Sequence, residues 1–476
     1  MTDNIKVRNL KAESRYFFII NFFVMALIAV ALWLIMPYGE IVGMRNMLVL
    51  NLIFTLGFMT FSLLLEKYSV TVAGMSEKIV INVLSSLYTF IVLCLINLIF
   101  FMDSKQFVSD IVLAMAAIVC ITLVDKICEK VVANPKRYRM PKLIIINSGD
   151  KTFLRMKRIK YGALSAYDSW YGNLGGKTTE EFKAFVEDAC TKFDAICILD
   201  GLGEEEYNIA VKTAINNEKD LFIVPDMIDV GKTNAKLVRF DDILTLYMPK
   251  HYISAAEHMA KRIMDIAISF VGCVVAAIPM AVIAIAIKLT SPGPVFYKQE
   301  RMTKDKKRFM IYKFRTMIPD AEKLTGPKFA EKDDPRITKI GKILRACRLD
   351  ELPQIINILK GDMSIVGPRP ERPVFIEQFE KEIENYNYRF AVKAGLTSLS
   401  HVYGRYSTYI HDRTYYDLFY ITNYSIMMDL KIILLTTKTM FMKSAAEGED
   451  DFKEKTTANT SSQHSFESKS KEETKI

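Results

Sequence analysis

Four apolar stretches fill the first quarter of this 476-residue chain. Each is close to the roughly 20 residues that a helix needs to cross the hydrocarbon core of a membrane. The stretches cover residues 16–36, 47–65, 79–101 and 107–124. The first is too long for a cleavable signal peptide, and no small-residue cleavage site follows it. The sequence therefore predicts four transmembrane helices within residues 1–135 and excludes a wholly soluble protein.

Basic residues beside these stretches predict the orientation of the bundle. Positive charge gathers in cytoplasmic segments, and the loops at 37–46 and 102–106 contain one basic residue each. The N-terminal flank contains Lys6, Arg8, Lys11 and Arg15, and the flank after the fourth stretch contains Lys126, Lys130, Lys136, Arg137, Arg139 and Lys142. The N-terminus and the domains that follow the bundle are therefore expected to face the cytoplasm.

Residues 136–248 alternate short apolar runs with helical patterns. The runs at 142–147, 195–200 and 220–225 end in turn residues, and helical periodicity is found at 179–192 and 204–217. This alternation predicts a cytoplasmic Rossmann-like α/β domain with a parallel sheet. After the first run, Asn147-Ser-Gly-Asp150 has one glycine where a dinucleotide-binding fold would carry three. A structural or regulatory module is the favoured interpretation, and a nucleotide site is the alternative.

A fifth apolar run, at 263–289, has no charged residue between 266 and 287. Basic residues flank both sides, which puts both ends in the cytoplasm and argues against the alternative, an ordinary crossing. Pro279 removes a backbone hydrogen bond in the middle of the run and is expected to bend or break the helix. The arms, 263–278 and 279–289, are each too short to span the bilayer. Residues 249–290 are therefore predicted to form a linker and a re-entrant membrane helix.

The chain has 63 Lys and Arg against 54 Asp and Glu, a net charge of +9. Residues 298–348 alone contain sixteen basic and seven acidic residues. Beside a membrane segment, such a block is expected to meet inner membrane lipids or a lipid phosphate, and nucleic acid is not an expected partner because no nucleic-acid-binding module is found. The seven cysteines are scattered, so neither a disulfide framework nor a zinc site is predicted. Residues 444–476 are polar and predict a disordered tail.

Alternating residues at 295–301 and 309–317 predict a β-hairpin. Lys313 and Arg315 would lie on one face of its second strand. Two cations on one face can bind a phosphate, although a solvated basic face is the alternative.

Charged residues of both signs gather between 334 and 370. Asp350, followed by Glu351, stands where a helix N-cap is expected, with Pro353 in the first turn and Gly361 at the end of the helix. The nearby guanidinium groups belong to Arg345, Arg348 and Arg369, the last between Pro368 and Pro370. Two carboxylates among such cations can bind Mg²⁺ and a diphosphate together, and the cations should keep Asp350 ionised. These residues predict a phosphoryl-transfer site.

Several motifs between Lys261 and Phe441 together resemble the monotopic phosphoglycosyl transferases, the bacterial sugar transferase family. The shared motifs are the apolar helix with its central proline, Ser291-Pro-Gly-Pro294, Gln299 and Arg301, Lys313-Phe-Arg-Thr-Met317, Asp334-Pro-Arg336, Leu349-Asp-Glu-Leu-Pro-Gln354, Gly361-Asp-Met-Ser-Ile-Val-Gly-Pro-Arg-Pro370, and Asp417, Tyr420, Asn423, Ser425 and Asp429. The preceding helices and α/β domain are similar to the long form of the family. The loops at 302–308 and 394–398 depart from the family pattern.

The resemblance implies that residues 291–443 form a small α/β catalytic domain at the bacterial inner membrane. It implies transfer of a sugar 1-phosphate from a UDP-sugar to undecaprenyl phosphate, with Mg²⁺ as cofactor and release of UMP. The reaction would start the synthesis of a capsule, exopolysaccharide or O-antigen, and the donor sugar stays open. A catalytically silent membrane scaffold or regulator on the same fold is the alternative, and by analogy a homo-oligomer is expected.

Carried over by motif, the resemblance also implies roles for individual residues. Asp350 would be the nucleophile that forms a phosphosugar-aspartyl intermediate, and Glu351 would be its metal-binding or proton-handling partner. Both carboxylates would hold Mg²⁺, and Lys313 would act beside them. Substrate contacts are implied for Arg301, Arg315, Arg345, Pro368, Arg369 and Pro370.

Overall fold

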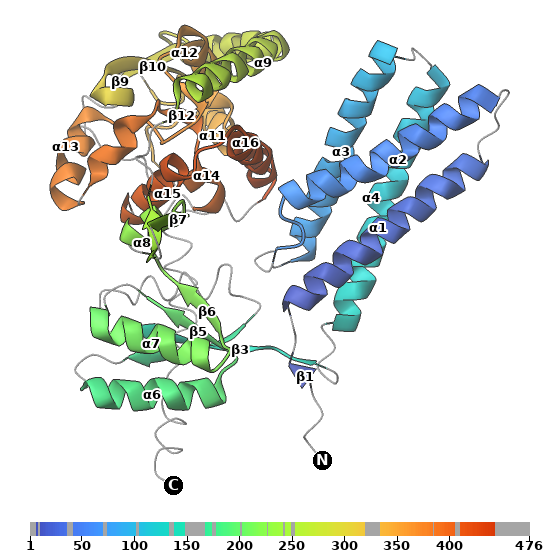
Figure 1. Ribbon diagram of the computed structural model, residues 1–476. Coiled ribbons are helices and arrows are strands. Elements are labelled where there is room, and N and C mark those ends of the chain that lie inside the picture. The colour runs from blue at the N-terminus through green and yellow to red at the C-terminus, as the bar shows by residue number, and fades with distance from the viewer. Residues whose placement is uncertain are drawn as a thin grey trace. The chain divides into compact units, whose positions relative to one another are not determined.

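The computed structural model describes residues 6–7, 10–35, 41–69, 74–100, 104–132, 138–147, 167–173, 178–199, 202–225, 227–240, 243–248, 253–318, 334–383, 385–404 and 410–442. The chain divides into two compact units, Met1–Asp226 and Met227–Ile476. Figure 1 shows the elements of each unit. The predicted tail at 444–476 lies outside the described residues.

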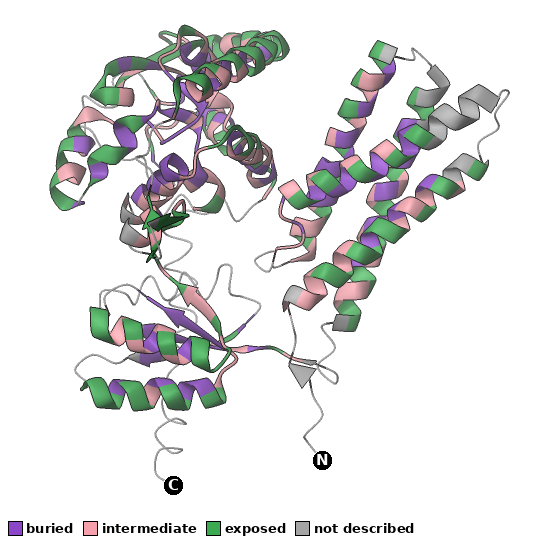
Figure 2. Cartoon of the chain, in the orientation of Figure 1, coloured by how far each residue is buried: buried purple, intermediate pink, exposed green. Residues whose placement is uncertain are grey.

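Four long apolar helices open the first unit, as the sequence predicts (Figure 1). They are α1 (Leu10–Ile35), α2 (Ile41–Leu64), α3 (Met75–Phe100) and α4 (Ser104–Val132). By length and composition α1, α3 and α4 can each cross a membrane, whereas the described apolar part of α2, Val49–Leu64, is shorter. Figure 2 shows exposed residues along these helices, and large apolar side chains such as Leu27 and Leu98 are among them. Such a surface suits contact with lipid.

A buried carboxylate joins the four helices. Asp125, on α4, is fully buried. Its Oδ1 accepts a hydrogen bond from Asn21 Nδ2 of α1 at 3.0 Å, and its Oδ2 accepts one from Asn82 Nδ2 of α3 at 3.0 Å. Lys67 Nζ, in the turn after α2, lies 2.7 Å from the same Oδ2. Because polar groups inside a membrane bundle are stable only when paired, Asp125 holds α1, α3, α4 and the end of α2 together.

The first unit also contains a parallel four-stranded sheet in the order β4-β3-β5-β6. Its strands are β3 (Lys142–Asn147), β4 (Asp168–Asn173), β5 (Ala195–Ile198) and β6 (Asp220–Ile223). Helices α6 (Thr179–Lys192) and α7 (Glu204–Asn216) cover one face, where Ile144 and Ile146 pack against Phe182 and Ala210. Two short strands, β1 (Lys6–Val7) and β2 (Tyr138–Arg139), pair separately.

The three predicted strands and both predicted helices of this sheet are confirmed. The edge strand β4 is not among them, because its sequence, Asp-Ser-Trp-Tyr-Gly-Asn, has no apolar run. Residues 148–150, which complete the Asn147–Asp150 motif, lie outside the described residues. The nucleotide site considered at that motif therefore stays a prediction.

The second unit begins with α8 (Met227–Lys232) and the antiparallel strands β7 (Lys236–Phe240) and β8 (Ile243–Tyr247). Hydrogen bonds attach this segment to the C-terminal part of the chain. Asn234 Nδ2 donates to the Thr422 carbonyl at 2.7 Å, and Asn423 Nδ2 donates to Thr233 Oγ1 at 2.7 Å. The predicted domain boundary at 248 therefore falls inside the second unit.

The fifth apolar run forms one helix, α9 (Ala255–Thr290). A capping box of Ser254 and Glu257 starts the helix, which continues through Pro279 without the predicted break. Its length and composition would allow it to cross a membrane. Near its middle, Val275 and Ile278 are 71 % and 77 % exposed, and an apolar surface this open suits lipid better than water. A bend at Pro279 stays a prediction.

Both halves of α9 contact other elements of the second unit. In the first half, Lys261 Nζ donates to Asp429 Oδ2 at 2.6 Å, and Tyr420 Oη donates to the other oxygen of that carboxylate at 2.8 Å. In the second half, Ile287 is fully buried in a cluster that contains Phe314. The exposed middle of the helix therefore lies between two fixed points.

The rest of the second unit builds a small α/β core. Strands β9 (Phe296–Met302) and β10 (Arg308–Phe314) confirm the predicted hairpin and are joined by the 3-10 turn η2 (Lys304–Lys306). They are followed by α11 (Lys339–Ala346), the 3-10 turn η3 (Leu349–Glu351), α12 (Gln354–Lys360), β11 (Ser364–Val366), α13 (Pro373–Glu382), the 3-10 helix η4 (Tyr386–Ala391), β12 (Gly395–Thr397), α14 (Leu399–Tyr403), α15 (Ile410–Thr422) and α16 (Ile426–Met440). Ile311, Ile358, Val366 and Ile432 share its core.

The side chain of Asn357 fastens α12 to strand β10. It is fully buried. Its Oδ1 accepts a hydrogen bond from the Tyr312 amide at 3.0 Å, and its Nδ2 donates to the Met310 carbonyl at 2.8 Å. Asn357 thereby satisfies two backbone groups of β10 that the hairpin itself leaves unpaired.

Replacing Asn357 by alanine should therefore destabilise the second unit. Two buried backbone groups would lose their partners, at about 1–3 kcal/mol each, and the midpoint of thermal unfolding in detergent should fall. The matched control is Asn217→Ala, which removes only an exposed hydrogen bond to the Thr213 carbonyl. An Asn357→Ala protein with the midpoint of the control would contradict this role.

Candidate active site

Lys313 and Glu351 form the centre of the candidate site. Lys313 lies near the end of β10, and Glu351 is the last residue of η3. Lys313 Nζ donates to Glu351 Oε1 at 2.6 Å, and the two side chains are 20 % and 18 % exposed. Ionised partners make this a strong hydrogen bond, and the remaining exposure leaves the pair within reach of a ligand.

Arg369 reaches the same carboxylate from the loop after β11. Its Nη2 lies 3.6 Å from Glu351 Oε1, and its Nη1 lies 2.7 Å from His401 Nε2. His401, on α14, is not among the predicted site residues. Fifty residues separate it from Glu351 in the sequence, and no motif around it points to this site. Only the fold brings the two together.

The adjacent carboxylates have opposite pKa shifts. Burial and the charge of Glu351 raise the pKa of Asp350, although Lys313 and Arg345 act in the other direction. Burial also acts to raise the pKa of Glu351, but Lys313 and Arg369 together bring it well below its usual range. Lys313 and Arg345 thus act on Asp350 in the expected direction, but burial and the charge of Glu351 outweigh them. That Asp350 is ionised stays a prediction.

Asp350 lies in the tight turn η3 and does not cap a helix. Helix α12 begins at Gln354, with Pro353 at its N-cap and no side-chain cap. A cap at Asp350 would need the amide of the second or third helical residue, and the third would be Pro353, which has no N–H. The turn begins at Arg348, whose φ of 55° lies in the left-handed region. Gly361, with φ of 92°, ends α12 as predicted.

Arg345 enters the site from α11. One turn earlier, Gly341 packs so closely that an added Cβ would lie 2.1 Å from the Thr316 carbonyl oxygen. This close approach places Arg345 Nε 2.9 Å from Thr316 Oγ1, to which it donates. The charge of Arg345 also acts to lower the pKa of Asp350, so its guanidinium group belongs to the site.

Three consecutive carbonyl groups hold the loop Pro368-Arg369-Pro370. The first accepts a hydrogen bond from the Gly395 amide at 2.9 Å, and the second accepts one from Arg389 Nη2 at 2.9 Å. The third accepts one from Arg301 Nη1 at 3.0 Å. Arg301 therefore contributes to the site through the backbone of this loop.

Arg315 does not join this group. Its guanidinium is buried, with Nη1 donating to the Pro292 carbonyl at 2.6 Å and Nη2 donating to the Ser291 carbonyl at 2.8 Å. The residue follows the last residue of β10, and its amide continues the hairpin by donating to the Val295 carbonyl at 2.9 Å. A shared strand face with Lys313 stays a prediction. In the structure Arg315 holds the turn after α9.

Asp350 and Glu351 are the candidate ligands for Mg²⁺. Among the described residues, no group of three or more His, Cys, Asp or Glu side chains could hold a metal ion. Mg²⁺ commonly binds one or two carboxylates and completes its shell with water and substrate phosphates. A cation would also relieve the repulsion by which Glu351 raises the pKa of Asp350. The donor set therefore fits the ion.

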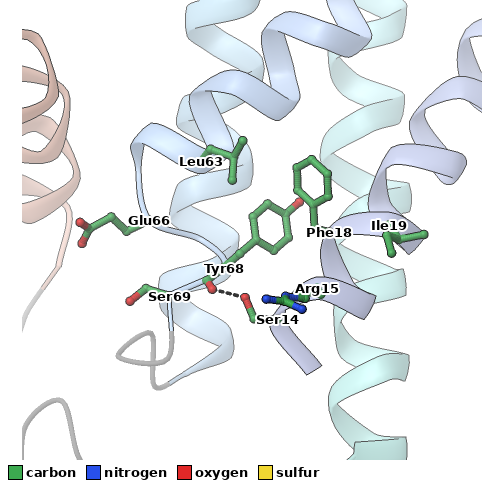
Figure 3. Close-up of a pocket in the computed structure, with 8 residues that line it drawn as sticks. All are labelled: Ser14, Arg15, Phe18, Ile19, Leu63, Glu66, Tyr68 and Ser69. Atoms are coloured by element: carbon green, nitrogen blue, oxygen red, sulfur yellow. Dashed lines mark hydrogen bonds between the residues drawn. The ribbon is translucent and has the colours of Figure 1, made fainter. Parts of the chain in front are cut away.

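A cavity of about 510 Å³ lies in the first unit beside the start of α1 (Figure 3). The ring of Tyr68 packs edge-on against Phe18 with ring centroids 5.3 Å apart, and the Ser14 hydroxyl donates to the Tyr68 carbonyl. Arg15 and Leu63 also line the cavity. None of the predicted site residues lines this cavity, so it is not assigned to the reaction.

Residues 256–443 match the family described as bacterial sugar transferase. This range contains every side chain of the candidate site. A Bacillus subtilis protein, provisionally named an undecaprenyl-phosphate N-acetylgalactosaminyl 1-phosphate transferase, is 52 % identical over 135 residues. These residues make up 28 % of this chain and 75 % of that protein.

Two longer relatives match over similar regions. The UDP-N-acetylgalactosamine-undecaprenyl-phosphate N-acetylgalactosaminephosphotransferase of Aeromonas hydrophila is 41 % identical over 183 residues, which are 38 % of this chain and 43 % of the relative. The UDP-glucose:undecaprenyl-phosphate glucose-1-phosphate transferase of Escherichia coli is 35 % identical over 232 residues, 48 % of this chain and 50 % of the relative. The chain thus spans about half the length of these two relatives.

Replacing Glu351 by glutamine should change how stability depends on pH. Because the folded pKa of Glu351 is lowered, its charge stabilises the fold above its unfolded pKa of about 4.3, and this contribution is lost as the pH falls toward the folded value. The difference in thermal midpoint between wild type and Glu351→Gln should be constant from about pH 5 to 8 and shrink below about pH 4.

The matched control for this change is Glu300→Gln, at an exposed glutamate of β9. Its midpoint should follow that of the wild type at every pH. A difference for Glu351→Gln that grows toward acid pH would contradict the lowered pKa.

Proposed function

The chain belongs to the bacterial sugar transferase family, and from this membership we propose that it transfers a sugar 1-phosphate from a UDP-sugar to undecaprenyl phosphate and releases UMP. The observation that carries the proposal is the Asp350-Glu351 pair, with Lys313 Nζ 2.6 Å and Arg369 Nη2 3.6 Å from Glu351 Oε1. An anionic nucleophile can attack an anionic diphosphate only where cations neutralise the charge. The names of the relatives describe such transferases.

We infer two displacements at one phosphorus atom. A carboxylate oxygen of Asp350 attacks the sugar-bearing phosphorus of the UDP-sugar, and the bond to the bridging oxygen breaks as UMP leaves with the electron pair. This step leaves a phosphosugar ester on Asp350. An oxygen of undecaprenyl phosphate then attacks the same phosphorus, and the Asp350 carboxylate leaves, which restores the enzyme.

The raised pKa of Asp350 supports its role as the nucleophile. Its charged form is less stabilised than that of a carboxylate in water, so its lone pairs are more reactive toward phosphorus. Glu351 is instead strongly stabilised as an anion, which suits a residue that holds Lys313 and Arg369 in place.

The cations of the site would bind the diphosphate. Lys313, Arg345 and Arg369 would neutralise its oxygens, and Arg301 would hold the loop that carries Arg369. Asp350 would also, with Glu351, hold Mg²⁺, which when bound would neutralise further phosphate charge.

We propose that α9 is a re-entrant helix at the cytoplasmic face of the bacterial inner membrane. Both of its halves are attached to the second unit, whereas Val275 and Ile278 between them are open and apolar. Basic residues flank both of its ends. This topology would keep the site at the interface, where a lipid phosphate and a soluble nucleotide can both reach it.

A UDP-hexose is the proposed donor, and UDP-N-acetylgalactosamine is the first to test. The names of the Aeromonas hydrophila and Bacillus subtilis relatives contain N-acetylgalactosamine or its transferred form, and the name of the Escherichia coli relative contains glucose. The alternative, a catalytically silent scaffold, would not need two carboxylates with three cations beside them. We further propose a Rossmann-like structural or regulatory role for residues 136–248 and self-association of the chain.

Replacing Asp350 by asparagine should lower UMP release by at least about 1,000-fold, the scale seen when a covalent nucleophile is removed. The assay uses the purified protein in detergent with Mg²⁺, undecaprenyl phosphate and a panel of UDP-sugars. No labelled sugar phosphate should remain on the variant protein. Asp188→Asn, at an exposed ion pair of α6, is the matched control and should keep full activity. Full activity of Asp350→Asn would remove Asp350 from the role.

Replacing Pro294 by cysteine tests the topology of α9 in a background without the seven native cysteines. A membrane-impermeant maleimide should label this variant only after the cells are opened, because the residue after a re-entrant helix stays in the cytoplasm. Glu40→Cys, in a loop predicted to lie outside, should be labelled in intact cells. Labelling of Pro294→Cys in intact cells would contradict the re-entrant topology and show that α9 crosses the membrane.

A further inference from the structure

The guanidinium group of Arg369 is shared between two side chains. Its Nη1 lies 2.7 Å from His401 Nε2, and its Nη2 lies 3.6 Å from Glu351 Oε1. A guanidinium can only donate hydrogen bonds, so His401 Nε2 accepts and the ring carries its proton on Nδ1. His401 is therefore a neutral acceptor for the cation of the site.

The ring of His401 is presented from a fixed element. The hydroxyl of Ser398 accepts a hydrogen bond from the His401 amide at 3.1 Å and caps α14. Ser398 is 2 % exposed, and the next residue, Leu399, packs in the core with Val366. A side chain anchored in this way can hold a partner more closely than one on an open loop.

The backbone of Arg369 is fixed as well, by the hydrogen bonds to the loop 368–370. Arg389, which donates to the Arg369 carbonyl, is itself paired with Asp417, its Nη2 2.9 Å from Asp417 Oδ2. Burial acts to lower the pKa of Arg389, but Asp417 and its other neighbours raise it, so this donor stays charged. With the backbone held, terminal partners such as Glu351 and His401 decide where the guanidinium lies.

We propose that His401 is a positioning residue for the donor diphosphate, because it holds the guanidinium of Arg369 beside Glu351 without letting the two close into a tight ion pair. This inference rests on the proposed function. The distance of 3.6 Å to Glu351 is longer than a hydrogen bond. Without the acceptor on His401, the carboxylate would draw Arg369 into a closer pair and occupy the N–H groups that a phosphate needs.

The charges around His401 agree with a neutral ring. Burial and the cation of Arg369 lower its pKa well below the usual range. Arg348 and Arg413 act in the same direction, and Glu351 opposes them. A protonated ring would repel Arg369, so this environment keeps the acceptor available.

Steady-state kinetics of His401→Leu and His401→Gln test the proposal on the full-length protein, with the UDP-sugar that supports turnover. His401→Leu should raise the KM for the donor about 10-fold or more with a smaller effect on kcat, because a charge-assisted hydrogen bond is lost. His401→Gln should stay within about threefold of the wild type, since its amide oxygen can accept from Arg369. His258→Leu, at a histidine of α9 outside this site, is the matched control.

A double-mutant cycle provides the second measurement, with binding of UDP followed by isothermal titration calorimetry. If His401 acts through Arg369, His401→Leu should weaken UDP binding in the wild type and have no further effect in an Arg369→Ala protein. Additive losses, or a His401→Gln protein as impaired as His401→Leu, would overturn the proposal. A wild type that neither turns over any donor nor binds UDP would instead refute the proposed function.

Discussion

The tight turn that carries Asp350 rests on α9. Leu349 and Leu352, on either side of the two carboxylates, pack with Ile287 from the second half of that helix, and the first half is held through the buried carboxylate of Asp429. In the proposed topology, the depth at which α9 lies in the membrane therefore sets the height of the carboxylates above it. The proposed reaction, between a nucleotide from water and a phosphate on a lipid, depends on such a fixed height, because both substrates must reach the same atom.

The protein makes two unlike carboxylates out of two neighbouring residues. Both are partly withdrawn from water, which by itself penalises the charge of each. The strand β10 and the loop after β11 bring Lys313 and Arg369 to Glu351, so the charge of Glu351 is compensated, whereas Lys313 and Arg345 offset burial at Asp350 only in part. Asp350 keeps a raised pKa for that reason. Asp350 and Glu351 are neighbours in the chain, so their different pKa shifts do not come from sequence position. They come from the places where β10 and the loop after β11 bring their cations.

The sequence predicted which residues form the site better than it predicted the contacts that those residues make. Lys313, Glu351 and Arg369 follow from residue types gathered around short motifs, and the structure brings them together. The bonds of Arg315 to two carbonyl groups could not be predicted, because they depend on how the turn after α9 approaches β10. His401 escaped prediction because its contact with Arg369 is made across 32 residues and no motif around it points to the site. At the level of the fold, length and periodicity predicted the long helices and the hairpin, whereas the polar edge strand β4 has neither signal.

The network around Asp125 has a consequence for how the protein is made. Asn82 enters the membrane with α3, before the ribosome has completed α4, which carries both of its acceptors, Thr122 and Asp125. An amide group without a partner is costly in hydrocarbon. The first three helices should therefore stay with the insertion machinery until α4 arrives, and the bundle should enter the lipid as one body. A chain that stalls before residue 122 would leave the Asn82 amide without these acceptors.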